Sequence, residues 1–315
     1  MIIGHAMVGF TFSVLLADRL GIQRKRYISV GIMGLSFALL PDFDLALGLT
    51  GAIESGFSGL SQTREEFWEE GLRYHRGITH SLVFGFISAT SFSLVSYKNK
   101  FKIIGSILAL LIVIVSFLTI GLLNTITISF YMVPGLLIAF VAKEYGLDGI
   151  PVIISSFTGL LTHPLGDVFI GPSPDLLAPL PFELVSDQLR LFQDPTTHIL
   201  SVFVLELVTV WVFIHVYLRI NEDFILGYIR PYAFFGTFYG LISPFIKPPE
   251  LGSADHIVIT ILMLCVTITL VRAFTFKYQG IWLGREVIKI LLVSGVGIAT
   301  VSVFSYIASY ILILN

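Results

Sequence analysis

The chain has 315 residues, of which 55% are hydrophobic and 13% are charged. Soluble domains carry about 25% charged residues, so a chain with half that share could not cover a water-facing surface with polar groups. A lipid bilayer accepts apolar side chains directly, and the composition therefore predicts a polytopic membrane protein. The net charge of −2 gives no reason to expect nucleic acid as a partner, and the single cysteine, Cys265, excludes a disulfide framework and a cysteine-based zinc site.

Long apolar runs predict an all-α bundle of about ten transmembrane helices, because one span needs about 20 apolar residues. Segment 103–142 contains no charged residue and no histidine. As a single helix it would measure roughly 60 Å, so we expect two passes with a break near Asn124 or Pro134. Residues 61–74 are expected to form an amphipathic helix at the membrane interface, anchored by Phe67 and Trp68. The remaining predicted helices are 3–17, 27–40, 80–97, 149–170, 197–219, 225–246, 256–276 and 287–313.

Basic residues predict the orientation of these helices, because Lys and Arg in short loops stay on the cytoplasmic side. If successive helices alternate in direction, every basic connection lies on one side of the membrane. The acidic connections 45–79 and 171–196 then lie on the other side, with both termini. The basic residues concerned are Arg19, Arg24, Lys25, Arg26, Lys98, Lys100, Lys102, Lys143, Lys277, Arg285 and Lys289.

Four short motifs place histidines and aspartates near the ends of predicted helices. In an alternating topology all four share the non-cytoplasmic side of the membrane, where the side chains could converge on one site. Mixed imidazole and carboxylate ligands suit zinc, manganese or iron better than calcium. The motifs are Gly4-His5, Pro41-Asp42-Phe43-Asp44, His75-Arg76-Gly77-Ile78-Thr79-His80-Ser81 and Thr162-His163-Pro164-Leu165-Gly166-Asp167.

The spacing inside the motifs suggests roles for individual residues. His163 and Asp167 are four residues apart, so they project from the same face of a helix. Asp42 and Asp44 are expected to point in different directions, with Asp42 the better candidate for a ligand. In the third motif, Gly77 is expected to let the chain turn.

The start of the helix at 80–97 is a candidate site for an anion. Thr79 is the expected N-cap of this helix. The free N–H groups of a helix start favour a negatively charged group, and Arg76 could help to bind it.

Each motif also has a structural explanation. His5 could be a polar anchor at the membrane interface, and Asp42 and Asp44 could simply end a helix. His163 and Asp167 are harder to explain in this way, because ionisable groups inside an apolar run are costly and usually functional.

The motifs resemble those of the YdjM-like family of membrane-bound metal-dependent hydrolases. The resemblance covers about residues 1–185, and segment 186–315 adds transmembrane helices outside it. The spacing of His163 and Asp167 is also similar to that in zinc-dependent phospholipase C and the S1/P1 nucleases, which use several zinc ions on phosphodiesters. The ligands that the resemblance implies are His5, Asp42, His75, His80, His163 and Asp167.

The sequence therefore suggests a metal-dependent hydrolase in the cell membrane. We expect one to three divalent ions, with zinc preferred and manganese or iron as alternatives. The metal would activate water against a phosphoester of a lipid or lipid-linked substrate. Arg76 would hold the phosphate, and Asp44 would act as a general base or as an acceptor for a ligating histidine. Two alternatives remain: a metal-ion or solute transporter, and a non-catalytic membrane scaffold with a structural metal.

Overall fold

The computed structural model describes residues 2–56, 59–97, 100–169, 172–227, 237, 241–242 and 285–314. These residues form ten α-helices and four 3₁₀ helices, and among them there is no β-strand. The all-α prediction is confirmed for this part of the chain. The chain divides into two compact units, Met1–Leu189 and Arg190–Asn315.

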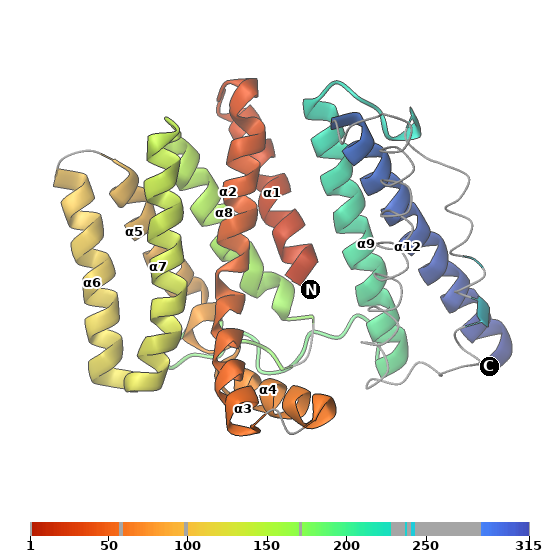
Figure 1. The fold of residues 1–315 in the computed structure, drawn as a ribbon, viewed down its shortest axis with the longest axis horizontal. Helices are drawn as coiled ribbons and strands as arrows, with labels where there is room; N and C mark the ends of the chain where they lie inside the picture. The colour runs from red at the N-terminus through yellow and green to blue at the C-terminus, as the bar shows by residue number, and fades with distance from the viewer. Residues whose placement is uncertain are drawn as a thin grey trace. The chain divides into compact units, whose positions relative to one another are not determined.

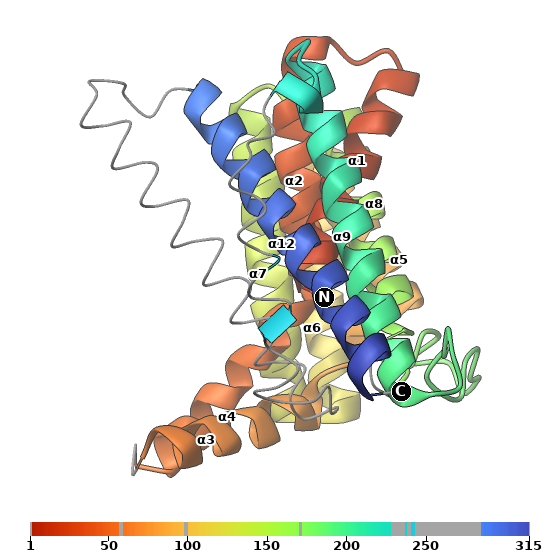
Figure 2. The same ribbon diagram turned by 90° about the vertical axis from the view of Figure 1, so that its right-hand side faces the viewer.

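The first unit contains eight described α-helices. Six of them pack side by side, whereas α3 and α4 run across one end of the unit (Figures 1 and 2). The predicted helices in this unit are confirmed, and α3 is an addition to them. The bounds are α1 Ile2–Arg19, α2 Tyr27–Leu39, α3 Gly48–Glu54, α4 Leu60–Tyr74, α5 Leu82–Ser96, α6 Lys100–Ile120, α7 Leu122–Glu144 and α8 Ile150–Asp167.

The long uncharged run forms two helices, as predicted, but the position of the break differs. The chain turns at Gly121, whose φ of 84° lies in the left-handed region that glycine adopts without strain. Asn124 lies in the first turn of α7, and Pro134 lies inside that helix. The expectation of a break at Asn124 or Pro134 was therefore wrong, because backbone freedom at glycine decides where this hairpin turns.

The second unit contains two long described helices, α9 Pro195–Ile220 and α12 Arg285–Leu314. They pack against each other, and the indole Nε1 of Trp211 donates a hydrogen bond to Thr300 Oγ1 across 2.9 Å. Both helices match predicted helices, and α9 also has the length and composition of a membrane span. The predicted helices 225–246 and 256–276 lie outside the described residues, except for 225–227, 237 and 241–242.

Several helices have the length and composition of membrane spans. Among the described residues, three qualify: Lys100–Thr119, Leu122–Glu144 and Thr197–Ile220. A fourth possible span is broken, because Arg24–Leu39 and Pro41–Glu54 meet at a bend of 44°. Irregular backbone at membrane depth is tolerated only where protein surrounds it or a cavity lies beside it. The chain is thus a membrane protein with a break in one candidate span.

Three glycines bring α1, α2 and α8 into close contact. A Cβ atom on Gly9 would lie 2.5 Å from the carbonyl oxygen of Gly34, and one on Gly159 would lie 2.6 Å from the same oxygen. Small residues allow helix backbones to approach closely in membranes. Gly9 and Gly159 are each four residues, or one helical turn, from His5 and His163 respectively. The glycine contact therefore fixes the spacing of the helices that position these two histidines.

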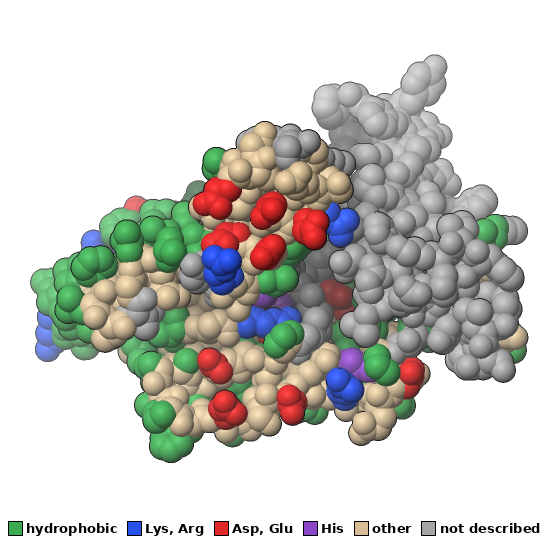
Figure 3. Space-filling model, turned by 90° about the horizontal axis from the view of Figure 1, so that it is seen from below, with side chains coloured by type: hydrophobic (Ala, Val, Ile, Leu, Met, Phe, Trp, Pro, Cys, Tyr) green, Lys and Arg blue, Asp and Glu red, His purple; other side chains and the backbone are tan. Residues whose placement is uncertain are grey.

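Helix α4 lies on the face that carries the acidic connections. Seen from below in Figure 3, acidic side chains gather on this face, and α4 contributes Glu65, Glu66, Glu69 and Glu70. Trp68 is 41% exposed, whereas Phe67 is half-buried and packs against Gly48 of α3. Phe67 thus packs between α4 and α3. The anchoring of Trp68 in the membrane stays a prediction.

Candidate metal centre

The six predicted ligands and Asp44 meet at one end of the first unit. Helix α1 contributes His5 near its start, and α8 contributes two residues from its last turn. The 3₁₀ helix Pro41–Leu47 follows α2, and the 3₁₀ helix Ile78–His80 precedes α5. Three groups of these residues have ligand atoms within 4.8 Å of one another, and they could hold a metal ion: His5, His163 and Asp167; Asp42, His80 and His163; Asp44, His75 and His80.

Four residues form the centre of this cluster. The Nε2 atom of His163 lies 3.5 Å from Asp42 Oδ1 and 3.3 Å from Asp167 Oδ2. The Nε2 atom of His80 lies 3.7 Å from Asp42 Oδ1 and 3.3 Å from Asp167 Oδ2. Two imidazole nitrogens and two carboxylate oxygens therefore face one another, although the four residues come from three distant parts of the sequence.

These distances fit a single tetrahedral ion. Zinc binds imidazole nitrogen and carboxylate oxygen at about 2.0–2.2 Å, and the ligand atoms of a tetrahedron with such bonds are about 3.3–3.6 Å apart. The measured nitrogen–oxygen separations run from 3.3 Å to 3.7 Å. Direct hydrogen bonds between these groups would be shorter, at about 2.7–3.2 Å. The spacing therefore suits ligands around a cation better than hydrogen-bonded partners.

The same centre contains buried polar atoms without hydrogen-bond partners. They are His80 Nε2, His163 Nε2, Asp42 Oδ2 and Asp167 Oδ2. His80 and His163 are completely buried, so water does not reach their imidazoles. Burying polar atoms without partners is costly, and most buried polar atoms in native proteins are satisfied. A bound cation would stabilise this concentration of unpaired lone pairs and negative charge.

A main-chain carbonyl group fixes the protonation of His163. The Nδ1 atom of His163 lies 2.6 Å from the carbonyl oxygen of Ala38, in the last turn of α2. A carbonyl oxygen can only accept, so Nδ1 carries the hydrogen and donates it. The neutral imidazole then has its free lone pair on Nε2, which faces the centre of the cluster. This is the protonation state in which histidine binds a metal.

Asp44 orients His80 from the side away from the centre. Its fully buried carboxylate accepts a hydrogen bond from Thr79 Oγ1 at 2.8 Å, and its Oδ2 lies 3.3 Å from His80 Nδ1. The other oxygen, Oδ1, lies 2.8 Å from Nδ1 of His75. Carboxylates placed in this way hold a ligating histidine in the required tautomer and orientation. The side chains of Asp42 and Asp44 therefore point in different directions, as expected.

The role of Thr79 differs from the expectation. The N-cap of α5 is Ser81, whose hydroxyl accepts from the main-chain N–H groups of Val83 and Phe84. Thr79 lies within the preceding 3₁₀ helix, where its hydroxyl donates to Asp44. Thr79 as the N-cap was wrong, because the helix begins at Leu82 and its free N–H groups are within reach of Ser81.

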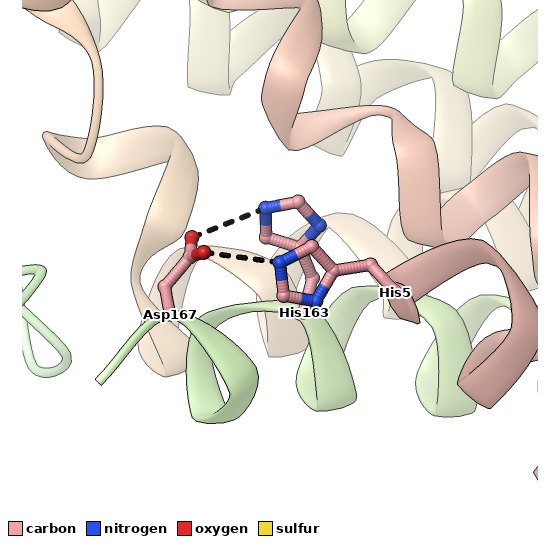
Figure 4. Close-up of side chains that lie close together, drawn as sticks. All are labelled: His5, His163 and Asp167. Carbon is pink, nitrogen blue, oxygen red and sulfur yellow. Dashed lines mark hydrogen bonds and ion pairs between the residues drawn. The ribbon is translucent and has the colours of Figure 1, made fainter. Parts of the chain in front are cut away.

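His5 contacts both His163 and Asp167 of α8, as Figure 4 shows. Its ring lies beside that of His163 with a centroid separation of 4.0 Å, and its Nε2 lies 3.0 Å from Asp167 Oδ1. The opposite oxygen of Asp167 faces the centre. Gly166 gives His5 the space it needs, because a Cβ atom there would lie 2.5 Å from the imidazole Cε1. His5 is therefore placed to hold the Asp167 carboxylate.

Comparison with protein families identifies the chain at this point. A family model described as YdjM inner membrane protein matches residues 1–274. The chain belongs to the YdjM family. The match includes every residue of the metal centre and extends beyond residue 185, where the resemblance of the motifs ends.

Two other comparisons gave no match for this YdjM-family chain. Neither the curated proteins nor the solved structures contain a significant match to it. The assignment to the family therefore rests on the family model. Any more specific statement about function depends on the geometry of the site.

Arg76 lies in an unusual backbone conformation between the two histidines of its motif. Its φ of 67° is left-handed, whereas Gly77 has a φ of −78°. Gly77 has a ψ of −140°, which lies outside the helical and extended regions, so the change of direction involves both Arg76 and Gly77. The guanidinium Nη1 donates to the carbonyl oxygen of Pro172 across 2.5 Å, so this side chain connects the motif to the segment after α8.

Proposed function

We propose that this YdjM-family chain is a membrane-embedded metal-dependent hydrolase with one ion held by Asp42, His80, His163 and Asp167. The observation that supports it most strongly is the central arrangement of two imidazole nitrogens and two carboxylate oxygens, with nitrogen–oxygen separations of 3.3–3.7 Å. Both imidazole nitrogens and one oxygen of each carboxylate are buried without a hydrogen-bond partner. In this proposal His5 and His75, which the sequence suggested as ligands, hold Asp167 and Asp44 in place. Zinc fits the donor set, and manganese or iron are the alternatives.

The residues around the ion would divide the work. A bound divalent metal acidifies water and polarises a phosphoester, which supplies the hydrolytic chemistry. Asp44 orients His80, because both of its oxygens already face donors from His75, Thr79 and His80. This occupancy favours the orienting role of Asp44 over the role of a general base. Arg76 is the residue that would bind the anionic oxygens of the substrate, as guanidinium groups commonly do.

The substrate in this proposal is a lipid or lipid-linked phosphoester from the non-cytoplasmic leaflet. Two observations support it. Asp42 and Asp44 directly follow the bend in a candidate membrane span. In Figure 1 the α1–α2 connection, which contains Arg24, and the end of α7, which contains Lys143, lie at the end of the first unit opposite the site. Basic loops stay in the cytoplasm, which would place the site on the other side.

The glycine contact argues against transport through the same ligands. A passing ion would need a polar route from the site toward the basic loops. One helical turn from His5 and His163, the contact of Gly9, Gly34 and Gly159 leaves no space for even a methyl group. Helices packed this closely seal the route between α1, α2 and α8, and we therefore favour a hydrolase over a transporter.

A structural metal is the second candidate function, and one observation favours it. Structural zinc sites have four protein ligands, whereas catalytic sites usually have three and keep one position open. His80 and His163 are fully buried, and Asp42 and Asp167 complete a set of four. A membrane scaffold would keep this set closed under all conditions, whereas a hydrolase must open it.

Hydrolysis by the purified full chain tests the proposal. The chain in lipid nanodiscs should cleave bis(4-nitrophenyl) phosphate or release phosphate-containing headgroups from phospholipid, and chelation should abolish the activity. His163→Ala should be inactive, whereas His215→Ala, at an exposed position on α9, should retain activity. A metal-loaded chain that cleaves neither substrate class would support the scaffold instead.

A further inference from the structure

Three of the four central residues are each held by a partner outside the centre. His163 donates to the carbonyl oxygen of Ala38 at 2.6 Å. His80 Nδ1 lies 3.1 Å from the hydroxyl of Thr79, which donates to Asp44, and Asp167 Oδ1 lies 3.0 Å from His5 Nε2. Such outer partners restrict rotation of a ligand and are costly to lose, typically about 10–100-fold in metal affinity.

Asp42 lacks this support. Its Oδ2 atom is buried and has no hydrogen-bond partner. Its Oδ1 atom lies 3.5 Å and 3.7 Å from the two central imidazoles, whereas the corresponding distances of Asp167 are both 3.3 Å. The side chain of Asp42 is 11% exposed, compared with 6% for Asp167 and 0% for both histidines. Asp42 is therefore the least constrained and the most accessible of the four.

The local backbone adds to this difference. Asp42 lies in the 3₁₀ helix Pro41–Leu47, next to the 44° bend, whereas His163 and Asp167 lie on the α-helix α8. The next residue, Phe43, is 45% exposed, so the chain surface begins immediately beside Asp42. Side chains on regular helices are placed more rigidly than those on irregular segments.

We infer that Asp42 is the exchangeable ligand, and that the centre opens to oxyanions such as phosphate on the Asp42 side. This inference rests on the proposed metal centre and adds the position at which substrate enters. With a metal bound, a phosphate oxygen would take the coordination position of the Asp42 carboxylate, which would leave as the anion without any electron transfer. His80, His163 and Asp167 would hold the ion.

Zinc affinity of matched carboxylate variants tests this inference without measuring hydrolysis. Asp42→Asn and Asp167→Asn each remove one negative charge from the centre and keep the size of the side chain. The full chain in detergent would be titrated against a chromophoric zinc chelator. Zinc affinity should fall at least about tenfold further in Asp167→Asn than in Asp42→Asn. Of these two carboxylates, only Asp167 is held by a residue outside the centre, His5. Equal losses in both variants would overturn the inference.

Cobalt substitution tests the opening itself. Inorganic phosphate should change the visible spectrum of the cobalt-loaded wild type, and it should do so at lower concentration in Asp42→Asn. A spectrum that does not respond to phosphate in either protein would overturn the inference. If Asp42→Asn does not fold, Asp42→Glu replaces it in the same titrations. A wild type that binds no zinc would instead refute the proposed function, so the two failures are distinguishable.

Discussion

The imidazole of His163 donates to the carbonyl oxygen of Ala38 across 2.6 Å, which joins α8 to the last turn of α2. Carbonyl groups in the last turn of a helix lack intrahelical partners, so this bond satisfies one of them. It also sets the register of the two helices close to the bend that precedes Asp42. The tautomer of His163 and the position of Asp42 are thus linked through one hydrogen bond.

Loss of the Asp44 carboxylate should weaken metal binding without removing a ligand. Asp44→Asn removes the negative charge that lies 3.3 Å from His80 Nδ1 and accepts from the Thr79 hydroxyl beside it. We expect zinc affinity to fall by about 10–100-fold, measured by competition with a chelator. Thr79→Val removes the hydroxyl that donates to Asp44 and lies 3.1 Å from His80 Nδ1, so zinc affinity should also fall in this variant. An unchanged affinity in Asp44→Asn would show that Asp44 does not orient His80.

Enlarging a glycine between the helices should damage both stability and the site. In Gly159→Ala the new methyl group would lie 2.6 Å from Gly34 O and 2.7 Å from the main-chain nitrogen of Ala38. Overpacking of this kind costs about 1–3 kcal/mol, and the shift of α8 should also lower zinc affinity. Thermal unfolding in detergent and chelator competition measure the two effects.

Gly59→Ala is the matched control for this substitution. A Cβ atom on Gly59 would meet no atom within 4 Å. Its zinc affinity should therefore equal that of the wild type, and its unfolding temperature should fall only slightly, because Gly59 is the N-cap of α4 and alanine caps less well. If Gly159→Ala also behaves like the wild type, the close glycine contact does not position the site.

Removal of the metal should destabilise the wild type. A ligand that binds only the folded state stabilises it by about 2.7 kcal/mol when its concentration is 100 times Kd. Chelation should therefore lower the unfolding temperature of the wild type, and addition of zinc should restore it. His163→Ala should show little response to either treatment. An equal response in both proteins would mean that zinc acts elsewhere on the chain.

The sequence predicted the convergence of the motifs because two regular rules apply to them. Helix alternation places the ends of successive spans on the same side, and the spacing of His163 and Asp167 places both on one helix face. The structure brings these residues together with His5, Asp42 and His80 at one end of the first unit. Their roles as metal ligands stay predictions.

The remaining features depend on contacts between segments that sequence spacing does not describe. The carbonyl group of Ala38 gives no signal in the sequence, since every residue has one. Thr79 and Ser81 are both good N-caps, and only the starting point of α5 distinguishes them. Gly9 and Gly159 could have been found, because each is four residues from a histidine of the site. Gly34, which contacts both of them, could be identified only from the packing of the helices.

Side-specific labelling tests the proposed orientation. Lys25 lies in the basic connection between α1 and α2, and Glu69 is exposed on α4 at the other end of the unit. In a Cys265→Ser background, an impermeant thiol reagent added to intact cells should label Glu69→Cys and leave Lys25→Cys unlabelled. Labelling of Lys25→Cys alone would place the metal centre on the cytoplasmic side.

Metal content is the most direct test of the metal centre. The full chain should be purified in detergent without added metal, and the divalent ions should be counted by elemental analysis. We predict about one ion per chain in the wild type, as expected for a tetrahedral site, and almost none in His163→Ala or Asp167→Ala. Full metal content in both variants, or none in the wild type, would contradict a metal centre at these residues.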